Sequence, residues 1–514
     1  MGGFDPGAAV QNLTWLKPEL LLVVVGFVLL GLSVVLPQDR RRAIAAVALV
    51  GVVAVAVLLA AYGPAVPGAG PKVLAGPGVR TFIDAEGRSA YVTDGFSIVF
   101  KIIFLIGAAL AILMAVRFLD DEGAQSGEFY AMVVFAVLGM MLLASGNDFA
   151  VLYIGLETMA LSVYVLVGFT KGNRKSNEAA LKYFLLGVFA SAILLYGVSL
   201  VYGTTGTYNL DGVAMAIAGG ETGPRSLLEI GAILVLVGMA FKVAAVPFHM
   251  WTPDAYEGAP TPVTAFISTA AKAAAFAMFL RVFLRGFYGL AADWTPLLVV
   301  LAIASMTLGN VVAILQDNVK RMLAYSSIAH AGYMLLGLIA VGAARGDALT
   351  QRYGMTAVVL YLLVYTFTNM GAFGMVAMLR RREIVGDRVE DFRGLARTNP
   401  LAAVTMLVFL LSLAGIPSTA GFIGKWWLFG SAVKADYAWL AVIAVVNSAI
   451  SLYYYARLVV AMYMTAPETE HRVVVSVPLA AALTVSLAFT LIIGVYPQPF
   501  IRFAQYALLP LAAP

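Results

Sequence analysis

Two lysine residues each lie close to a proline inside a long apolar segment. Lys242 precedes Pro247 in the stretch FKVAAVPFHMWTPDAYEGAPTP, and Lys425 follows Pro417 in LSLAGIPSTAGFIGKWWLF. A charged side chain inside a membrane helix costs roughly 2.5 to 3.5 kcal/mol on insertion scales and is usually kept for an ion or proton pathway. A proline there frees a backbone carbonyl, and irregular backbone at membrane depth survives only where it is packed in protein or lines a wet cavity. The two segments therefore predict broken helices on a proton or cation path centred on Lys242.

Three more charged residues lie inside apolar segments. Lys272 stands among small residues in STAAKAAAFAMFL, in a helix that we expect to pack closely against its neighbours. Glu157 falls near the middle of the segment 149–169, where an isolated carboxylate is protonated or paired. Its expected partner is Lys182 in the next segment, although Lys182 is close enough to the end of that segment to reach the membrane surface instead. These positions extend the predicted path around Lys242.

A histidine and two acidic residues each fit two interpretations. The hydroxyl side chains at helical spacing from His330 are those of Ser326, Ser327 and Tyr333. They fit a hydrated proton relay or a histidine whose hydrogen bonds only support packing. Asp254 and Glu257 follow the first break and fit a proton entry or a solvated loop. The tyrosine run 453–455 is interpreted as helix packing.

These side chains can exchange protons without breaking the fold. Burial disfavours the charged form of a lysine, so Lys242 can release its proton when a neighbouring charge changes. If Lys182 left Glu157 and stood about 8 Å from Lys242, the repulsion would be on the order of 2 kcal/mol at an effective dielectric constant near 20. We expect the proton then to pass through water towards Lys272, His330 and finally Lys425.

The composition excludes most soluble functions. The chain has 514 residues, of which 61% are apolar and 12% charged, and its mean hydropathy is +0.91, as in a polytopic membrane protein. Basic loops on one side of a membrane explain the net charge of +5, so no nucleic-acid partner is expected. The absence of cysteine excludes cysteine-ligated zinc, iron–sulfur clusters and covalently attached haem, and three histidines argue against a histidine-rich metal site. We expect no cofactor or metal in this chain.

Segments of suitable length and hydropathy predict an all-α protein with about fourteen transmembrane helices. They lie near 19–36, 43–62, 94–116, 128–144, 149–169, 178–203, 226–248, 262–286, 293–315, 320–342, 355–379, 400–433 (broken), 437–463 and 474–495. With both termini outside, the cytoplasmic side receives the basic residues, as the positive-inside rule requires. They are Arg40, Arg41, Arg42, Lys171, Arg174, Lys175, Lys320, Arg321, Arg380, Arg381 and Arg382. In the outer loop 63–93, the run TFIDAEGRSAYVTD predicts a β-hairpin with its turn near 86–88.

The two breaks also predict an internal repeat. Pro247 and Pro417 are separated by about the length of five helices with their loops. An odd number of helices in each unit inverts the second unit relative to the first, as in many transporters. The broken helices would then be helices 7 and 12. The predicted division is 1–127 for helices 1–3 with the hairpin loop, 128–290 and 291–465 for the two five-helix repeats, and 466–514 for helix 14 and the tail.

Three long blocks resemble the antiporter-like membrane subunits of respiratory complex I. They are FKVAAVPFHMWTPDAYEGAPTPVTAFISTAAKAAAF, KRMLAYSSIAHAGYMLLG and FRGLARTNPLAAVTMLVFLLSLAGIPSTAGFIGKWWLF. The resemblance covers the whole chain and is strongest over 146–429. Within this superfamily the chain is most similar to the subunit N family of bacterial proton-translocating NADH–quinone oxidoreductases, because Lys425 stands where subunit M generally has Glu and because GLARTNPLAA and LAGIP are typical of subunit N. Ser418 departs from the family, which often has a second proline there.

The resemblance implies a role for each candidate residue. Glu157 and Lys182 match the coupling pair, Lys242 the central lysine of broken helix 7 and Lys272 the bridging lysine of helix 8. His330 matches the hydrated link in helix 10, and Lys425 the exit lysine of broken helix 12. All six residues would transfer protons.

The resemblance also implies where the redox chemistry takes place. NADH, FMN, iron–sulfur clusters and quinone are expected in other subunits. The expected partners are the other membrane subunits of complex I, especially subunit M and the small membrane subunits, together with lipids of the bacterial inner membrane. Two alternatives stay open: a subunit of an Mrp-type cation/proton antiporter, and a structural membrane anchor that does not pump.

Overall fold

The computed structural model describes residues 12–37, 42–62, 78–84, 86–124, 127–344, 346–380, 386–467 and 475–509. Its elements in chain order are α2 (Lys17–Val35), α3 (Arg42–Tyr62), β1 (Val79–Ile83), β2 (Ser89–Thr93), α4 (Gly95–Asp121), α5 (Gly127–Ser145), α6 (Phe149–Val167), α7 (Arg174–Thr205), α8 (Leu210–Gly219), α9 (Arg225–Val243), α10 (Trp251–Gly258), α11 (Thr261–Phe266), the π-helix η2 (Ile267–Ala271), α12 (Lys272–Arg281), the π-helix η3 (Val282–Gly286), the 3-10 helix η4 (Tyr288–Leu290), α13 (Ala291–Ile314), α14 (Val319–Ala343), α15 (Ala348–Leu379), the 3-10 helix η5 (Val389–Phe392), α16 (Leu395–Thr398), α17 (Pro400–Ala414), α18 (Ala420–Lys434), α19 (Ala438–Met464), α20 (Val477–Val495) and α21 (Gln498–Gln505).

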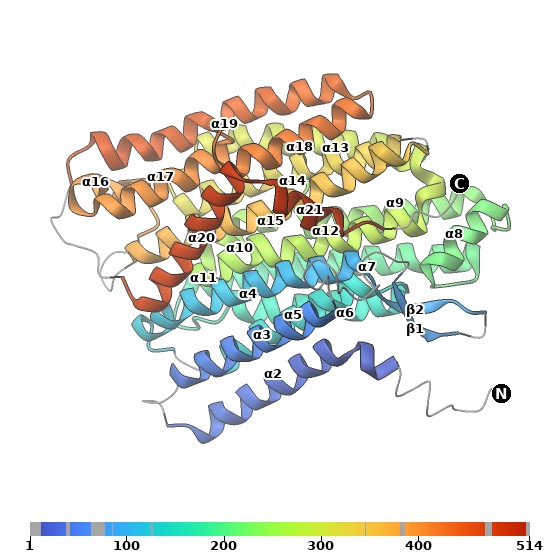
Figure 1. The fold of residues 1–514 in the computed structure, drawn as a ribbon, viewed down its shortest axis with the longest axis horizontal. Coiled ribbons are helices and arrows are strands. Elements are labelled where there is room, and N and C mark those ends of the chain that lie inside the picture. The colour runs from blue at the N-terminus through green and yellow to red at the C-terminus, as the bar shows by residue number, and fades with distance from the viewer. Residues whose placement is uncertain are drawn as a thin grey trace.

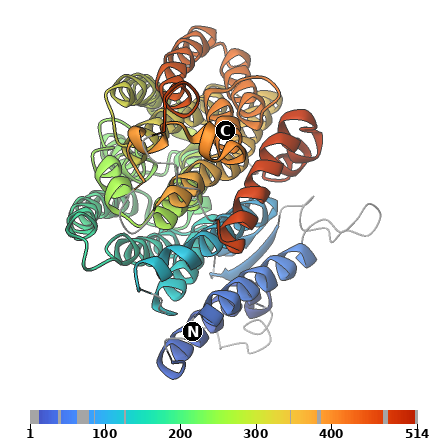
Figure 2. The same ribbon diagram turned by 90° about the vertical axis from the view of Figure 1, so that its left-hand side faces the viewer.

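The long helices lie side by side along the longest axis of the molecule (Figure 1). The N-terminal helices α2 and α3 and the C-terminal helix α20 flank the central bundle, as the turned view in Figure 2 shows. We call the end that carries the strands β1 and β2 the hairpin end, and the opposite end, which carries α10, the elbow end.

The predicted membrane segments correspond to helices in the structure. Among the described residues, thirteen helices are long and apolar enough to cross a membrane. The remaining predicted segment, 400–433, is divided between α17 and α18. The predicted all-α polytopic membrane architecture is therefore confirmed. The division into two repeats stays a prediction, although three unbroken spans precede a broken one in each unit. Of the predicted basic loops, Arg40, Arg41, Arg381 and Arg382 lie outside the described residues.

The predicted hairpin is present. Strands β1 and β2 pair antiparallel, with Val79 opposite Thr93 and Ile83 opposite Ser89. The Asp84 Oδ1 atom accepts hydrogen bonds from the backbone N–H groups of Glu86 and Arg88, which closes the turn. The hairpin is joined to the bundle by the backbone N–H of Asn147, which donates to the carbonyl of Ala90.

Helix α9 ends earlier than the proline predicts. Its last residue is Val243, because Ala244 adopts a left-handed conformation with φ of 64°. The N–H of Ala245 then closes the helix end on the carbonyl of Ala240. Two side chains satisfy backbone groups of the break: Ser305 Oγ accepts from the N–H of Val246 at 2.9 Å, and the Trp251 indole donates to the carbonyl of Phe241 at 2.9 Å. The break is thus packed against α13 and α10.

The second break has a different local shape. Helix α17 ends at Ala414, and Gly415 takes the left-handed conformation with φ of 86°. Ser418 is also left-handed, with φ of 68°. Because a proline ring fixes φ near −65°, this conformation excludes proline at that position. Ser418, where the family often has a second proline, therefore fits the backbone conformation of this break.

The helix that carries Lys272 is continuous but irregular. Elements α11, η2, α12 and η3 follow one another without a loop, and two of them are π-helices. Such π-turns widen a helix locally and are frequent at functional sites. Lys272 comes directly after η2, whose Ser268 hydroxyl accepts a hydrogen bond from Asn369 at 2.7 Å.

Candidate functional site

Lys242 lies in the last turn of α9 and is almost completely buried. Its Nζ is 3.5 Å from the hydroxyl of Tyr164 and lies over the rings of Tyr164 and Phe241. It forms no ion pair with any residue that the structure describes. Glu157, on α6, is close enough to interact electrostatically with Lys242. Its Oε1 is buried and has no hydrogen-bond partner among the described residues. Lys242 and Glu157 form the first group of the predicted path.

The predicted pair between Glu157 and Lys182 is not formed in this structure. Lys182 Nζ instead lies 2.8 Å from Glu178 Oε1 and 3.0 Å from Asp254 Oδ2. The prediction failed because residues 251–258 fold as the helix α10 rather than as a loop, which brings Asp254 against α7. The side chain of Lys182 is 46% exposed there, so its charge stays hydrated and avoids the penalty of burial beside Glu157.

Lys272 points from α12 to α14. Its Nζ donates to the carbonyl oxygen of Ser327 at 2.7 Å and contacts the Ser327 hydroxyl at 2.5 Å. That hydroxyl also lies 3.4 Å from the Tyr256 hydroxyl on α10. The lysine is buried, and its partners are neutral oxygens rather than carboxylates.

His330 lies between two tyrosine hydroxyls in the centre of the bundle. Its Nδ1 is 2.5 Å from the hydroxyl of Tyr361, and its Nε2 is 3.3 Å from that of Tyr455. Tyr455 also contacts the Ser326 hydroxyl at 2.5 Å. Tyr454 and Tyr455 are buried, as the packing interpretation expects, and the hydroxyl of Tyr455 in addition bonds the histidine.

Lys425 satisfies the carbonyl groups at the second break. Its Nζ donates to the carbonyl oxygens of Leu413 and Ala414, both at 2.9 Å, and to the Ser448 hydroxyl at 2.8 Å. A cation at the C-terminal end of α17 also complements the helix dipole. The ammonium lies 5.2 Å from the ring centroid of Tyr333.

The structure brings three of the six predicted residues into one group. His330 lies within electrostatic range of both Lys272 and Lys425. Serines 326 and 327 are consecutive on α14. Ser327 contacts Lys272, and Ser326 contacts Tyr455, which is a partner of His330. The group of Lys242 is linked to this one by aromatic side chains whose rings contact one another in sequence, namely Tyr164, Tyr183, Trp251 and Tyr256.

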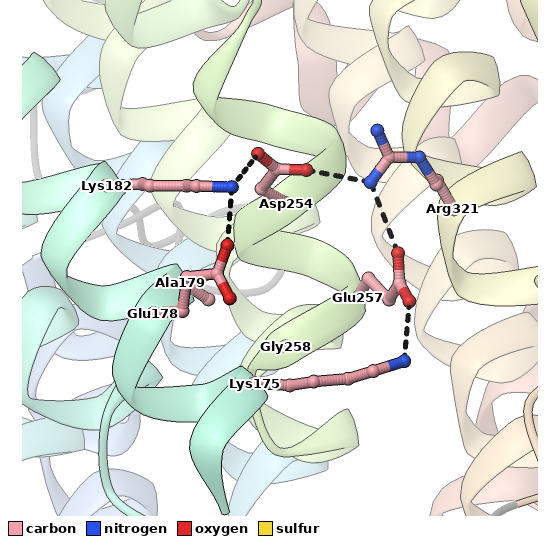
Figure 3. Close-up of a pocket in the computed structure, with 8 residues that line it drawn as sticks. All are labelled: Lys175, Glu178, Ala179, Lys182, Asp254, Glu257, Gly258 and Arg321. Atoms are coloured by element: carbon pink, nitrogen blue, oxygen red, sulfur yellow. Dashed lines mark hydrogen bonds and ion pairs between the residues drawn. The ribbon is translucent and has the colours of Figure 1, made fainter.

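The acidic residues of α10 belong to a chain of ion pairs that spans the three helices α7, α10 and α14, drawn in Figure 3. We call this set the elbow chain: Lys175, Glu178, Lys182, Asp254, Glu257 and Arg321. Lys320, which the sequence places in a basic loop, is instead buried. Its Nζ donates to the carbonyl oxygens of Glu257 and Ala259 at the end of α10.

Sequence reasoning missed the buried charges at the hairpin end. We call them the hairpin-end pairs. Lys101 Nζ lies 2.7 Å from Glu19 Oε1, and Tyr91 donates to the same carboxylate. Arg281 Nη2 lies 2.9 Å from Asp94 Oδ1. Lys101 stands alone in an apolar run, as Lys272 does, and that signal could have found it.

The three central lysines share a chemical setting. Each is buried, forms no ion pair with the described residues and contacts hydroxyl or carbonyl oxygens. A hydroxyl group can donate or accept a hydrogen bond, so it can serve a lysine in either protonation state. Such a setting can hold and release a proton, which an ammonium locked to a carboxylate does less easily.

Comparisons with known proteins show the family to which the chain belongs. The family model described as "NADH:quinone oxidoreductase/Mrp antiporter, TM" matches residues 146–451. The chain is 45% identical to NADH-quinone oxidoreductase subunit N of Trichlorobacter lovleyi, over 96% of this chain and 97% of that protein. It is 44% identical to subunit N of Moorella thermoacetica, over 96% of this chain and 98% of that protein.

Solved structures show the same fold. The chain is 34% identical to a chain of respiratory complex I from Thermus thermophilus with bound aureothin, with a TM-score of 0.76 over 95% of this chain and 100% of that one. A chain of the Mrp complex from a Dietzia species has the same fold, with a TM-score of 0.81 and 24% identity over 95% of this chain and 96% of that one. The chain belongs to the subunit N family of NADH-quinone oxidoreductases, the antiporter-like membrane subunits of proton-translocating complex I.

Proposed function

We propose that this chain carries protons across the membrane through Glu157, Lys242, Lys272, His330 and Lys425. Lys182 acts as the charge that switches the path. The observation that carries this proposal is the common setting of the three central lysines, which are buried without a carboxylate partner among the described residues and contact neutral oxygens. Charges inside a membrane are costly and usually mark an ion or proton pathway, which favours this function for the three lysines.

The redox chemistry is proposed to lie in other subunits. NADH, FMN, iron–sulfur clusters and quinone bind there, and quinone reduction there drives proton movement here. This chain contributes to the NADH:quinone oxidoreductase reaction as a subunit without redox chemistry of its own. Its proposed partners are subunit M, the small membrane subunits and membrane lipids.

The proposed location is the inner membrane of a bacterial cell. An even number of spans places both termini on one side. The basic residues that the structure describes near the elbow end, including Lys171, Arg174 and Arg380, favour that end as the cytoplasmic one, because cytoplasmic loops carry the excess of Lys and Arg. Both termini then face outward.

Proton pumping by the assembled enzyme tests the path. Lys242→Ala in an otherwise complete enzyme should sharply reduce the protons pumped per NADH oxidised in membrane vesicles, because it removes one proton-transfer group from the path. Lys434→Ala is the matched control, because this lysine is exposed at the end of α18. Assembly is checked on the same preparation.

The same experiment separates the alternatives. Parental pumping in an assembled Lys242→Ala enzyme would overturn the proposed path and favour a structural anchor. Sodium-dependent exchange without NADH oxidation would favour an Mrp-type antiporter, whose fold this chain shares.

A further inference from the structure

The elbow chain connects helices from different parts of the sequence. Lys182 of α7 binds Asp254 Oδ2 at 3.0 Å, and Arg321 of α14 binds Asp254 Oδ1 at 2.7 Å. Arg321 also binds Glu257 at 3.2 Å, and Glu257 binds Lys175 at 3.0 Å. In Figure 3 the carboxylate of Asp254 lies between the ammonium of Lys182 and the guanidinium of Arg321. One carboxylate on the broken helix thus holds cations from α7 and α14 together.

Helix geometry explains why these charges meet. Asp254 and Glu257 are three residues apart and therefore lie on one face of α10. At Gly258 an added Cβ would lie 2.5 Å from the Ala179 side chain and 2.5 Å from the Lys175 carbonyl oxygen. The absence of a side chain lets α10 approach α7 closely. This close approach sets the acidic face of α10 against the lysines of α7.

A further carboxylate, that of Glu157, lies at a depth similar to that of Lys182. With a rise of 1.5 Å per residue, Glu157 lies about 15 Å from the elbow end of α6, and Lys182 lies about 12 Å from that end of α7. Helices α6 and α7 pack together, since the Tyr164 ring contacts the Tyr183 ring. Glu157 Oε1 is buried without a hydrogen-bond partner among the described residues, and Glu157 interacts electrostatically with Lys242. Glu157 is therefore an unsatisfied acceptor near the central lysine.

We propose that Asp254 and Glu157 compete for Lys182 and that Arg321 holds Asp254 in position for this exchange. This inference rests on the proposed function, in which Lys182 is the switching charge. The structure represents the state in which Lys182 binds Asp254 and Glu157 faces Lys242 alone. When Lys182 moves to Glu157, it offsets the negative charge near Lys242 and favours proton release from it. This order is the reverse of the one expected from the sequence, in which Lys242 releases its proton when Lys182 leaves Glu157.

The arrangement also gives α14 a part in the exchange. Arg321 lies at the start of α14, which carries Ser327 and His330 further along. Departure of Lys182 leaves Asp254 with Arg321 as its cation, so the charge balance at the start of α14 changes with the position of Lys182. Asp254 and Arg321 are thus positioning residues for the proton path.

Asp254→Asn tests the competition. The substitution keeps the size of the side chain and removes the charge that holds Lys182 at the elbow. The ratio of Lys182 on Glu157 to Lys182 at the elbow should rise about threefold, the factor for a half-exposed ion pair. Cryo-electron microscopy of the assembled enzyme measures the position of Lys182, and protons pumped per NADH should change by a similar factor. Asp254→Glu keeps the negative charge, so the position of Lys182 and the protons pumped per NADH should both stay close to those of the parent.

Glu257→Gln is the matched control, since Glu257 lies on the same face of α10 and binds Arg321 but does not touch Lys182. It should leave Lys182 in place. If Asp254→Asn does not assemble, Glu178→Gln removes the other carboxylate on Lys182 and should shift it in the same direction.

Three outcomes test whether Asp254 and Glu157 compete for Lys182. Movement of Lys182 towards Glu157 with altered pumping supports the competition. An unmoved Lys182 and parental pumping in Asp254→Asn overturn it, provided that Glu157→Gln in parallel reduces pumping. If Glu157→Gln also pumps at the parental level, the proposed function itself fails together with the competition.

Discussion

The hairpin-end pairs and the elbow chain hold their charges in different ways. At the hairpin end, the paired side chains of Lys101 and Glu19 are only 1% and 4% exposed. At the elbow end, Lys182 is 46% exposed and Asp254 is 31% exposed, and Asp254 has two cations. A buried one-to-one pair cannot separate without leaving a charge in an apolar medium, whereas a hydrated and shared pair can. The hairpin-end pairs are therefore suited to hold the fold, and the elbow chain to exchange partners.

Breaking a hairpin-end pair should have the largest effect. Lys101→Met leaves the carboxylate of Glu19 buried without its cation, which should cost about 3 to 5 kcal/mol of stability. Thermal unfolding and subunit content of the detergent-purified complex measure the loss. The double variant Lys101→Met with Glu19→Gln removes both charges and should recover most of it. A single variant as stable as the parent would show that this end is not fixed by its ion pair.

Removing the shared cation of the elbow chain should matter less for stability. Arg321→Gln leaves Asp254 with Lys182 and Glu257 with Lys175. Because all these groups are partly hydrated, the loss should be about 1 kcal/mol or less. The same thermal measurement compares it with Lys101→Met. Equal losses would erase the distinction between the two ends.

Salt should separate the ends further. At 1 M ionic strength the Debye length falls to about 3 Å, which screens exposed charges far more than buried ones. The stability difference between the parent and Arg321→Gln should therefore shrink in 1 M salt, while the difference for Lys101→Met should persist. Melting temperatures of both variants at low and high salt provide the measurement, and equal salt responses would contradict it.

The smallest expected effect is a dependence on acid pH at the elbow end. Burial raises the pKa of Asp254, but hydrogen bonds and ion pairs with Arg321 and Lys182 outweigh it and lower this pKa below its ordinary value. A carboxylate with a lowered folded pKa contributes its stability above the unfolded pKa, about 4, and loses it as the pH falls through the folded value. The difference in the free energy of unfolding between the parent and Asp254→Asn should be at its maximum at pH 6 and should fall to zero as the pH is lowered. Thermal unfolding over this range checks it, and a constant difference would refute it.

The membrane segments could be predicted because hydropathy and length are local properties. The hairpin could also be predicted from a local pattern, since a turn at 86–88 separates two short alternating runs. The central lysines were found because a charge in an apolar run is visible in one dimension. The partner of Lys182 could not be found from the sequence, because Asp254 is far away in sequence and its position depends on how α10 packs against α7.

The sequence by itself determined which residues must lie in the membrane and which charges are costly there, because both follow from composition within one segment. It also located the two breaks to within a few residues. Only the tertiary structure decided which oxygen faces each charge: the carbonyls of α17 for Lys425, Ser327 for Lys272 and Asp254 for Lys182. Such partners depend on which helices pack together, and packing joins residues that no local pattern relates.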